Sequence, residues 1–182
     1  GVATFAGVGI NGTVGANYTL SFSSGSLTGA TQGATVSPAL GAASQLVLTT
    51  AAAGAASGAA FTTQPVVAVR DAGNNTVTTD GSTVTMTVSA GATTLGTATA
   101  TAASGVATFS TVGINGTVGT SYTLTFTKAG LTSATQAITP TLGAASQLVL
   151  TRAASGAVNG AAFTTQPVVA VRDAGNNTVT TD

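Results

Sequence analysis

Two pairs of near-identical segments dominate this chain, and the repetition limits its possible folds more than any other feature. Residues 41–80 and 143–182 are identical at 36 of 40 positions, and residues 1–22 match residues 105–126 at 17 of 22 positions. The offsets of 102 and 104 residues agree on a period near 100 residues, which predicts a tandem array of similar structural units. The expected divisions are the C-terminal part of one repeat (1–40), a complete repeat (41–142) and the N-terminal part of the next repeat (143–182).

The chain is almost free of charge, which argues against several classes of function. Its 182 residues include four Lys or Arg and four Asp, with no Glu, His, Cys or Trp. The sequence contains no basic patch that could bind nucleic acid. It also contains no His, Cys or Glu to act as a general base or thiolate, and no visibly activated nucleophile for catalysis. We therefore expect neither an enzyme nor a cofactor, and no run of about 18 apolar residues predicts a membrane span in this segment. Zero net charge gives little repulsion between copies, so the expected partner is the chain itself, through neighbouring repeats or a polymer.

Apolar and small polar residues alternate along the complete repeat, as they do in half-buried β-strands. In residues 82–89 and 122–127 every second residue is a large apolar one, and helical periodicity occurs nowhere. Turn residues separate about seven such segments, so we predict an all-β fold, an antiparallel β-sandwich. The expected strands are residues 44–50, 61–71, 82–89, 93–102, 105–109, 122–127 and 131–139, with a small-residue loop at 51–60.

Large apolar side chains on the alternating segments are expected to point into the core of this sandwich. Burying one such side chain is worth about 1.5–3 kcal/mol, so these positions should contribute most to the stability of the unit. The expected core residues are Val67, Val69, Val84, Met86, Val88, Phe109, Tyr122, Leu124 and Phe126.

The two partial repeats are predicted to hold too few strands for sandwiches of their own. In residues 1–40 we expect strands at 18–22 and 27–35, and a turn at the Asn11–Gly12 dipeptide. A lone hairpin is marginally stable in water, so each partial repeat needs a complement. Either the polypeptide continues at both ends, or chains join head to tail and exchange strands. The first alternative is favoured, because residues 81–104 have no second copy and an exchanged sandwich would lack a central strand.

The motifs of the repeat permit a comparison with a known family. The stretch QPVVAVRDAGNN, followed by TVTMTV, GVATF and YTLTFT, resembles the bacterial Ig-like repeats of invasin- and intimin-type adhesins and other large surface or secreted proteins. The resemblance covers the whole chain and implies tandem Ig-like sandwiches of about seven strands, used as a spacer or stalk outside the cell or on its surface. Tyr18 and Tyr122 would stand where Ig-like sandwiches place a corner tyrosine. The absence of Cys and Trp separates the chain from antibody-type domains.

The most polar cluster of the repeat is Arg70–Asp71–Ala–Gly–Asn74–Asn75, and we interpret it as a turn. Asp and Asn side chains bond to their own backbone and tolerate left-handed conformations. The alternative is a weak Ca²⁺ site between domains, using oxygens of Asp71, Asn74 and Asp80. Calcium takes six or more oxygen ligands, usually with several carboxylates, so the sequence favours the turn and no metal site is expected.

Five Asn residues begin N-x-Ser/Thr triplets, which accept glycans when a chain passes a glycosylation machinery. They are Asn11, Asn17, Asn74, Asn115 and Asn176. In a chain so rich in Thr, chance explains such triplets, and Ser121 replaces Asn17 in the second copy.

Two functional hypotheses follow from the repeat. The leading one is a structural extracellular protein that forms a stalk or filament, since identical units give uniform elements with nearest-neighbour contacts. The alternative is an adhesin whose repeats themselves bind a glycan or protein receptor. Receptor sites are rich in Trp, Tyr and Arg, and with two Tyr and no Trp the sequence favours the stalk.

Overall fold

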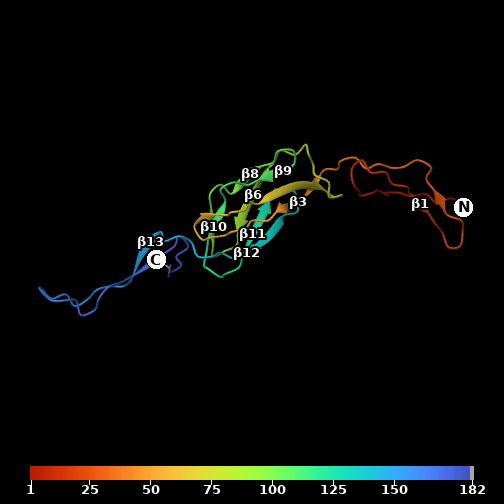
Figure 1. Ribbon diagram of the computed structural model, residues 1–182. Coiled ribbons are helices and arrows are strands. Elements are labelled where there is room, and N and C mark those ends of the chain that lie inside the picture. The colour runs from red at the N-terminus through yellow and green to blue at the C-terminus, as the bar shows by residue number, and fades with distance from the viewer. Residues whose placement is uncertain (181–182) are drawn as a thin grey trace.

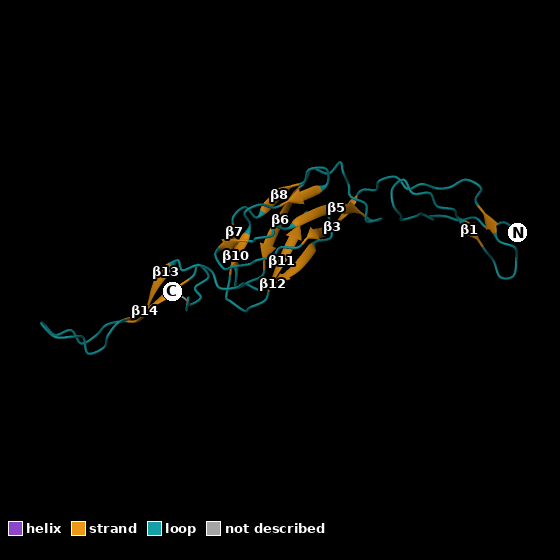
Figure 2. Ribbon diagram, viewed as in Figure 1, coloured by secondary structure: helices purple, strands orange, loops and turns teal. Residues whose placement is uncertain are grey.

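Fourteen strands and no helix make up the part of the chain described by the computed structural model, residues 1–180 (Figure 2). Residues 41–142 form the thick centre of an elongated molecule, and a thin arm extends from each side of it (Figure 1). The N-terminal arm is residues 1–40 and the C-terminal arm is residues 143–180. Since residues 1–180 contain no helix, they contain none that is long and apolar enough to cross a membrane.

Two antiparallel sheets build the centre. One has the strand order β3-β5-β9 and the other β12-β11-β6-β8. Their strands are rich in Val, Thr and other residues that favour the extended backbone, with small polar residues on the outer face. Their bounds are β3 (Ala43–Thr50), β5 (Val66–Asp71), β6 (Thr83–Val88), β8 (Thr99–Thr101), β9 (Val106–Thr108), β11 (Tyr122–Thr127) and β12 (Ala134–Ile138).

The inner faces of these two sheets share one apolar core, which makes the arrangement sandwich-like. Val67 and Val69 of β5 and Val84 and Met86 of β6 belong to the same buried cluster. The rings of Phe109 and Phe126 meet edge to face with centroids 5.5 Å apart, a favourable aromatic geometry. Among the nine expected core positions, Val88 is half-buried at the edge of the cluster, and the buried ones are Val67, Val69, Val84, Met86, Phe109, Tyr122, Leu124 and Phe126.

Residues 41–142 contain ten strands rather than about seven, and the extra strands are short. Residues 93–102, expected as one segment, divide into β7 (Thr93–Leu95) and β8, and the loop at 51–60 ends in β4 (Ala59–Ala60). β4 and β7 flank β10 (Gly113–Asn115) in a third sheet. The expected strands do not include residues 113–115. β10 lies so close to β4 that a Cβ on residue 113 would collide with Ala59 and Ala60, so the pairing requires Gly113.

The N-terminal arm keeps part of the pairing of the repeat but loses most of its length. In the N-terminal arm, the strands expected at 18–22 and 27–35 shrink to β1 (Ser21–Phe22) and β2 (Ala30–Thr31), with one further bridge between Tyr18 and Val36. In the complete repeat the counterpart of β1 is β11, which is held on both sides by β12 and β6. The arm has no counterpart of β6, so its hairpin pairs on one side only.

The C-terminal arm holds β13 (Gln147–Arg152) and β14 (Val168–Arg172), which pair with each other. Their register repeats that of β3 and β5: Leu148 faces Val171 as Leu46 faces Val69. Local pairing is therefore the same in both copies, although the second sheet is missing from the arm.

Candidate functional site

The polar cluster predicted as a turn is a turn, and it ends β5. The N–H of Asn74 donates to the carbonyl of Asp71 at 3.0 Å, and Asn74 has a φ of 66°, a left-handed conformation that Asn tolerates. Arg70 Nη1 donates to Asn74 Oδ1 at 3.0 Å. The end of a paired strand thus fixes where the side chains of Asp71 and Asn75 emerge.

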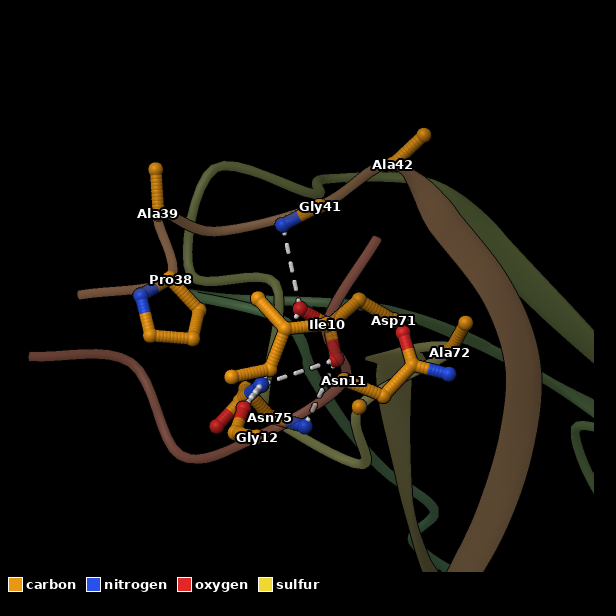
Figure 3. A pocket seen from close by; sticks show the side chains of 11 residues that line it. Ile10, Asn11, Gly12, Pro38, Ala39, Gly41, Ala42, Asp71, Ala72 and Asn75 are labelled. Carbon is orange, nitrogen blue, oxygen red and sulfur yellow. Dashed lines mark hydrogen bonds between the residues drawn. The ribbon is translucent and has the colours of Figure 1, made fainter. Parts of the chain in front are cut away.

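The carboxylate of Asp71 is buried and collects backbone and side-chain donors. Its Oδ1 accepts the Asn75 N–H at 2.8 Å and its Oδ2 accepts the N–H of Gly41, the first residue of the complete repeat, at 3.0 Å (Figure 3). Asn75 Nδ2 lies 3.1 and 3.2 Å from the two oxygens. The N–H groups of Asn75 and Gly41 lower the pKa of Asp71 although burial raises it, so the carboxyl is ionised at neutral pH.

The side chain of Asn75 links the complete repeat to the arm before it. Its Nδ2 donates to the carbonyl of Gly12 at 2.9 Å, and its Oδ1 accepts the N–H of Val14 at 3.0 Å. One amide therefore satisfies a backbone donor and a backbone acceptor of the neighbouring repeat, as a β-strand would. We call Gly12, Val14, Gly41, Asp71 and Asn75 the N-terminal junction.

The same contacts recur 102–104 residues later. Asn177 Nδ2 donates to the carbonyl of Gly116 at 2.9 Å, and Asn177 Oδ1 accepts the N–H of Val118 at 2.9 Å. Asp173 accepts the N–H groups of Asn177 at 2.9 Å and of Gly143 at 3.1 Å. We call these five residues the C-terminal junction.

The pKa of Asp173 is lowered as that of Asp71 is, but burial has a larger influence on it. Asp173 also accepts the N–H of Gly175 at 2.9 Å. Burial is the largest influence and raises the pKa of Asp173, but the backbone and side chain of Asn177 with the N–H groups of Gly143 and Gly175 outweigh it, so the pKa is lowered.

A tyrosine holds each loop that the junction Asn binds. Tyr122 Oη accepts the N–H of Thr117 at 3.0 Å and donates to the carbonyl of Gly91 at 3.2 Å. Tyr18 Oη accepts the N–H of Thr13 at 3.0 Å. The turn expected at Asn11–Gly12 lies instead at Val14 and Gly15, where the N–H of Ala16 donates to the carbonyl of Thr13.

Ser57 completes the C-terminal junction from inside the central repeat. Its buried hydroxyl donates to the carbonyl of Gly116 at 3.1 Å and accepts the Gly116 N–H at 3.2 Å. A Cβ added at Gly143 or Gly175 would collide with Ser57, so both glycines are required by close approach rather than by flexibility. The side chain of Asn177 and the hydroxyl of Ser57 therefore bind the same carbonyl, one from each repeat.

A cavity of about 310 Å³ occupies the corresponding place at the N-terminal junction (Figure 3). The segment equivalent to 55–58 would belong to the first part of the preceding repeat, which residues 1–40 do not include. The cavity is lined by Ile10, Asn11, Gly12, Pro38, Ala39, Gly41, Ala42, Asp71, Ala72, Gly73 and Asn75.

The side-chain oxygens of Asp71, Asn74 and Asp80, which were considered as calcium ligands, each accept hydrogen bonds from different donors and do not point at a common position. The Asp71 oxygens bind N–H groups, and Asn74 Oδ1 accepts from Arg70. Asp80 accepts from the hydroxyl of Ser82 and, at 2.9 Å, from its N–H, and Lys128 Nζ lies 4.0 Å away. Residues 1–180 hold no group of three or more His, Cys, Asp or Glu side chains that could hold a metal ion.

The triplet asparagines differ in accessibility. Asn115 is half-buried in β10, beside the C-terminal junction, whereas the others are exposed: Asn11, Asn17, Asn74 and Asn176. That these triplets arise by chance stays a prediction.

Sequence reasoning found the turn but missed what the turn binds. Asn75 reads as one more turn residue, and Ser57 reads as part of a small-residue loop. Their partners, Gly12 and Gly116, lie about 60 residues away in the chain. A single sequence carries no signal for a hydrogen bond between a side chain and a distant backbone group.

Comparison with known proteins adds little to these observations. No protein-family model matches the chain, and no curated protein matches it. Two crystal structures of β-glucuronidase from Parabacteroides merdae are similar to part of it, one of them with glycerol in the active site. The glycerol-containing structure is 13% identical, over 58% of this chain and 13% of that chain, and the other is 12% identical, over 62% and 15%; both have a TM-score of 0.40. The chain spans no more than 15% of the length of these enzymes, and a likeness this distant carries no inference about activity.

Proposed function

We propose that the chain is a structural extracellular repeat protein, whose tandem Ig-like sandwiches join end to end into a stalk or filament of a bacterial surface. The observation that supports this most is the recurrence of one set of hydrogen bonds at both junctions. Asn75 and Asn177 bind equivalent backbone groups of the preceding repeat within 0.1 Å of the same lengths. Contacts that repeat with the sequence period would give every pair of neighbours the same geometry.

The chemistry of the junction suits a mechanical role. Each junction joins backbone groups to the amide of one Asn and the carboxylate of one Asp, which accepts N–H donors. Neither junction contains an exposed ion pair. Salt screens interactions between exposed charges over about 8–10 Å, whereas the hydrogen bonds of the junction, which are part-buried or exposed, do not join two charged groups. A connection of this kind would keep its geometry outside a cell, where ionic strength varies.

The Ig-like assignment rests on the sequence resemblance together with two features of the centre. Two antiparallel sheets share one core, and the Tyr122 hydroxyl binds a backbone N–H five residues upstream, as corner tyrosines do. The extracellular setting is carried by the resemblance alone.

Electron microscopy of the native material tests the proposal. We expect linear objects of constant width, with globular units repeating once per sequence period. The adhesin alternative predicts saturable binding of this chain to a glycan or a purified receptor, measured by calorimetry. Binding of that kind, together with native material that shows no linear array, would overturn the structural role.

A further inference from the structure

The first and the last strand of the complete repeat meet along one edge of the sandwich. β3 is the edge strand of one central sheet and β12 is the edge strand of the other, and the two lie against each other. Gln45 and Thr132 form a parallel bridge there. The Leu46 N–H donates to the Thr132 carbonyl at 2.8 Å, and the Thr132 N–H donates to the Ser44 carbonyl at 3.0 Å. This contact therefore joins the two ends of the unit directly.

A side chain continues the contact beyond the end of β3. Gln136 Nε2 donates to the carbonyl of Ala52 at 2.7 Å, and Gln136 Oε1 accepts the Ala52 N–H at 2.8 Å. The amide thus makes the two bonds that a neighbouring strand would make. Ala52 is buried, and buried backbone groups need partners of this kind.

A third contact lies beside the C-terminal junction. Ala56 and Thr141 form a second parallel bridge. The Ser57 N–H donates to the Thr141 carbonyl at 3.0 Å, and the Thr141 N–H donates to the Ala55 carbonyl at 2.8 Å. Because the Ser57 hydroxyl also binds Gly116, this contact ends at the place where the next repeat is attached.

We call these three contacts the seam, which joins residues 44–57 to residues 132–141. The two segments run parallel along it, since residues 45, 52 and 56 meet residues 132, 136 and 141 in the same order. One segment begins near the N-terminal arm, the other ends near the C-terminal arm, and the arms leave the centre on opposite sides (Figure 1). Tension between the arms therefore pulls the two segments past each other along their length.

Sliding of this kind strains the bonds of the seam together. Hydrogen bonds between β-strands lie across the strand direction, so a strand that slides along its neighbour strains all of them at once. A hairpin that is opened from its free end breaks its bonds one after another instead. Bonds that share the strain raise the barrier to unfolding, which is what decides how long a unit stays folded under force.

We propose that the seam bears the tension along the chain, and that the amide of Gln136 is its central contact. The inference rests on the proposed function, because neighbouring units of a stalk or filament pull on each other through their ends. It names the hydrogen bonds that resist this pull inside each unit.

Both members of the central contact have identical counterparts in the partial repeats. Gln32 corresponds to Gln136 and Ala154 corresponds to Ala52. In an array of such repeats the same contact would occur once per sequence period, so no unit would be weaker than its neighbours for lack of it.

Gln64 provides a matched control elsewhere in the unit. Its Nε2 donates to the carbonyl of Val112 at 3.0 Å, and its Oε1 accepts the Val112 N–H at 3.0 Å. Like Gln136, Gln64 is half-buried and binds both backbone groups of one buried residue. Neither Gln64 nor Val112 belongs to the seam, so sliding of its two segments does not strain this contact directly.

Single-molecule pulling on the full chain tests the seam. The chain is held at its two ends and unfolded at constant force, and each variant is also unfolded in urea without force. Gln136→Ala leaves two backbone groups of the seam unpaired, so the unfolding rate of the complete repeat under force should rise about tenfold. Gln64→Ala should lose comparable stability in urea but change the rate under force no more than about twofold, because its contact still holds when the seam breaks.

Equal effects of the two variants under force, or an unchanged rate for Gln136→Ala, would overturn the proposal. Gln136→Glu covers the case in which Gln136→Ala does not fold. It keeps the acceptor for the Ala52 N–H but loses the donor to the Ala52 carbonyl, so it should raise the rate by a smaller factor, and no rise would again overturn the proposal. Linear arrays in native material would then still support the stalk or filament, so the two proposals fail separately.

Discussion

The complete repeat and its partial copies have nearly the same sequence but bury it very differently. Leu46 is 4% exposed and its copy Leu148 is 74% exposed; for Phe61 and Phe163 the values are 3% and 45%. Both copies nevertheless pair their strands in the same register. Strand pairing is thus a local property of the repeat, whereas burial depends on a second sheet that only the complete repeat possesses.

The largest expected difference between the complete repeat and the N-terminal arm is in the stability cost of removing the equivalent rings of Phe126 and Phe22. Phe126→Ala should lower the free energy of unfolding of the complete repeat by about 3–5 kcal/mol, because it leaves a cavity beneath the second sheet. Phe22→Ala removes the equivalent ring of the N-terminal arm, which pairs with Phe5 at 5.3 Å but is exposed. Its effect should stay within about 0.5 kcal/mol. Urea denaturation of the full chain measures both, and equal effects would mean that the arm buries its face in solution.

Leu46→Ala and Leu148→Ala sharpen the same comparison within identical local sequence. The first should cost about 2–5 kcal/mol, since Leu46 belongs to the buried core. The second should cost no more than about 0.5 kcal/mol at concentrations where the chain is monomeric. If the cost of Leu148→Ala grew with protein concentration, the C-terminal arm would be docking on another copy.

The junctions provide a third contrast. Asn177→Ala leaves the buried carbonyl of Gly116 with Ser57 alone and the N–H of Val118 without its partner, a cost of about 1–3 kcal/mol. Asn75→Ala should cost less, because Gly12 is half-buried whereas Gly116 is buried; Val14 and Val118 are equally exposed. Hydrogen exchange reports the change directly: protection should fall at Val118 in the first variant and at Val14 in the second. Unchanged protection at both amides would show that the Asn side chains do not hold the repeats together.

Acid should loosen both junctions in a defined pH window. The pKa of Asp71 and of Asp173 is lowered in the folded chain, so each carboxylate stabilises the junction above its ordinary pKa of about 3.9. That stability is lost as the pH falls through the lower folded pKa, which places the loss below about pH 4 and leaves neutral pH unaffected. Protection of the Gly143 amide should drop in this window. In Asp173→Asn the window should disappear, and its persistence would assign the acid effect to other groups.

Chelators are expected to have no effect on the stability of either the complete repeat or the arms. The oxygens of Asp71, Asn74 and Asp80 face N–H, hydroxyl and cationic donors. The melting temperature in EDTA should therefore equal that in added Ca²⁺. A fall of many degrees in EDTA, restored by Ca²⁺, would show a calcium site that holds neighbouring repeats together.

The sequence by itself determined the period of the chain, its all-β class and the inward face of β5, β6 and β11. Those features are local: alternation with a period of two decides which of Leu124 and Thr125 points inward, and Asn74 forms its turn from its own neighbours. The short strands β4 and β10, and the division of residues 93–102 into β7 and β8, were not predictable, because they depend on where other segments come close enough to pair. The same holds for the junctions. Only the tertiary structure decided that Asn75 binds Gly12 and that Ser57 binds Gly116, since hydrogen bonds across some 60 residues depend on how whole repeats pack rather than on any local pattern.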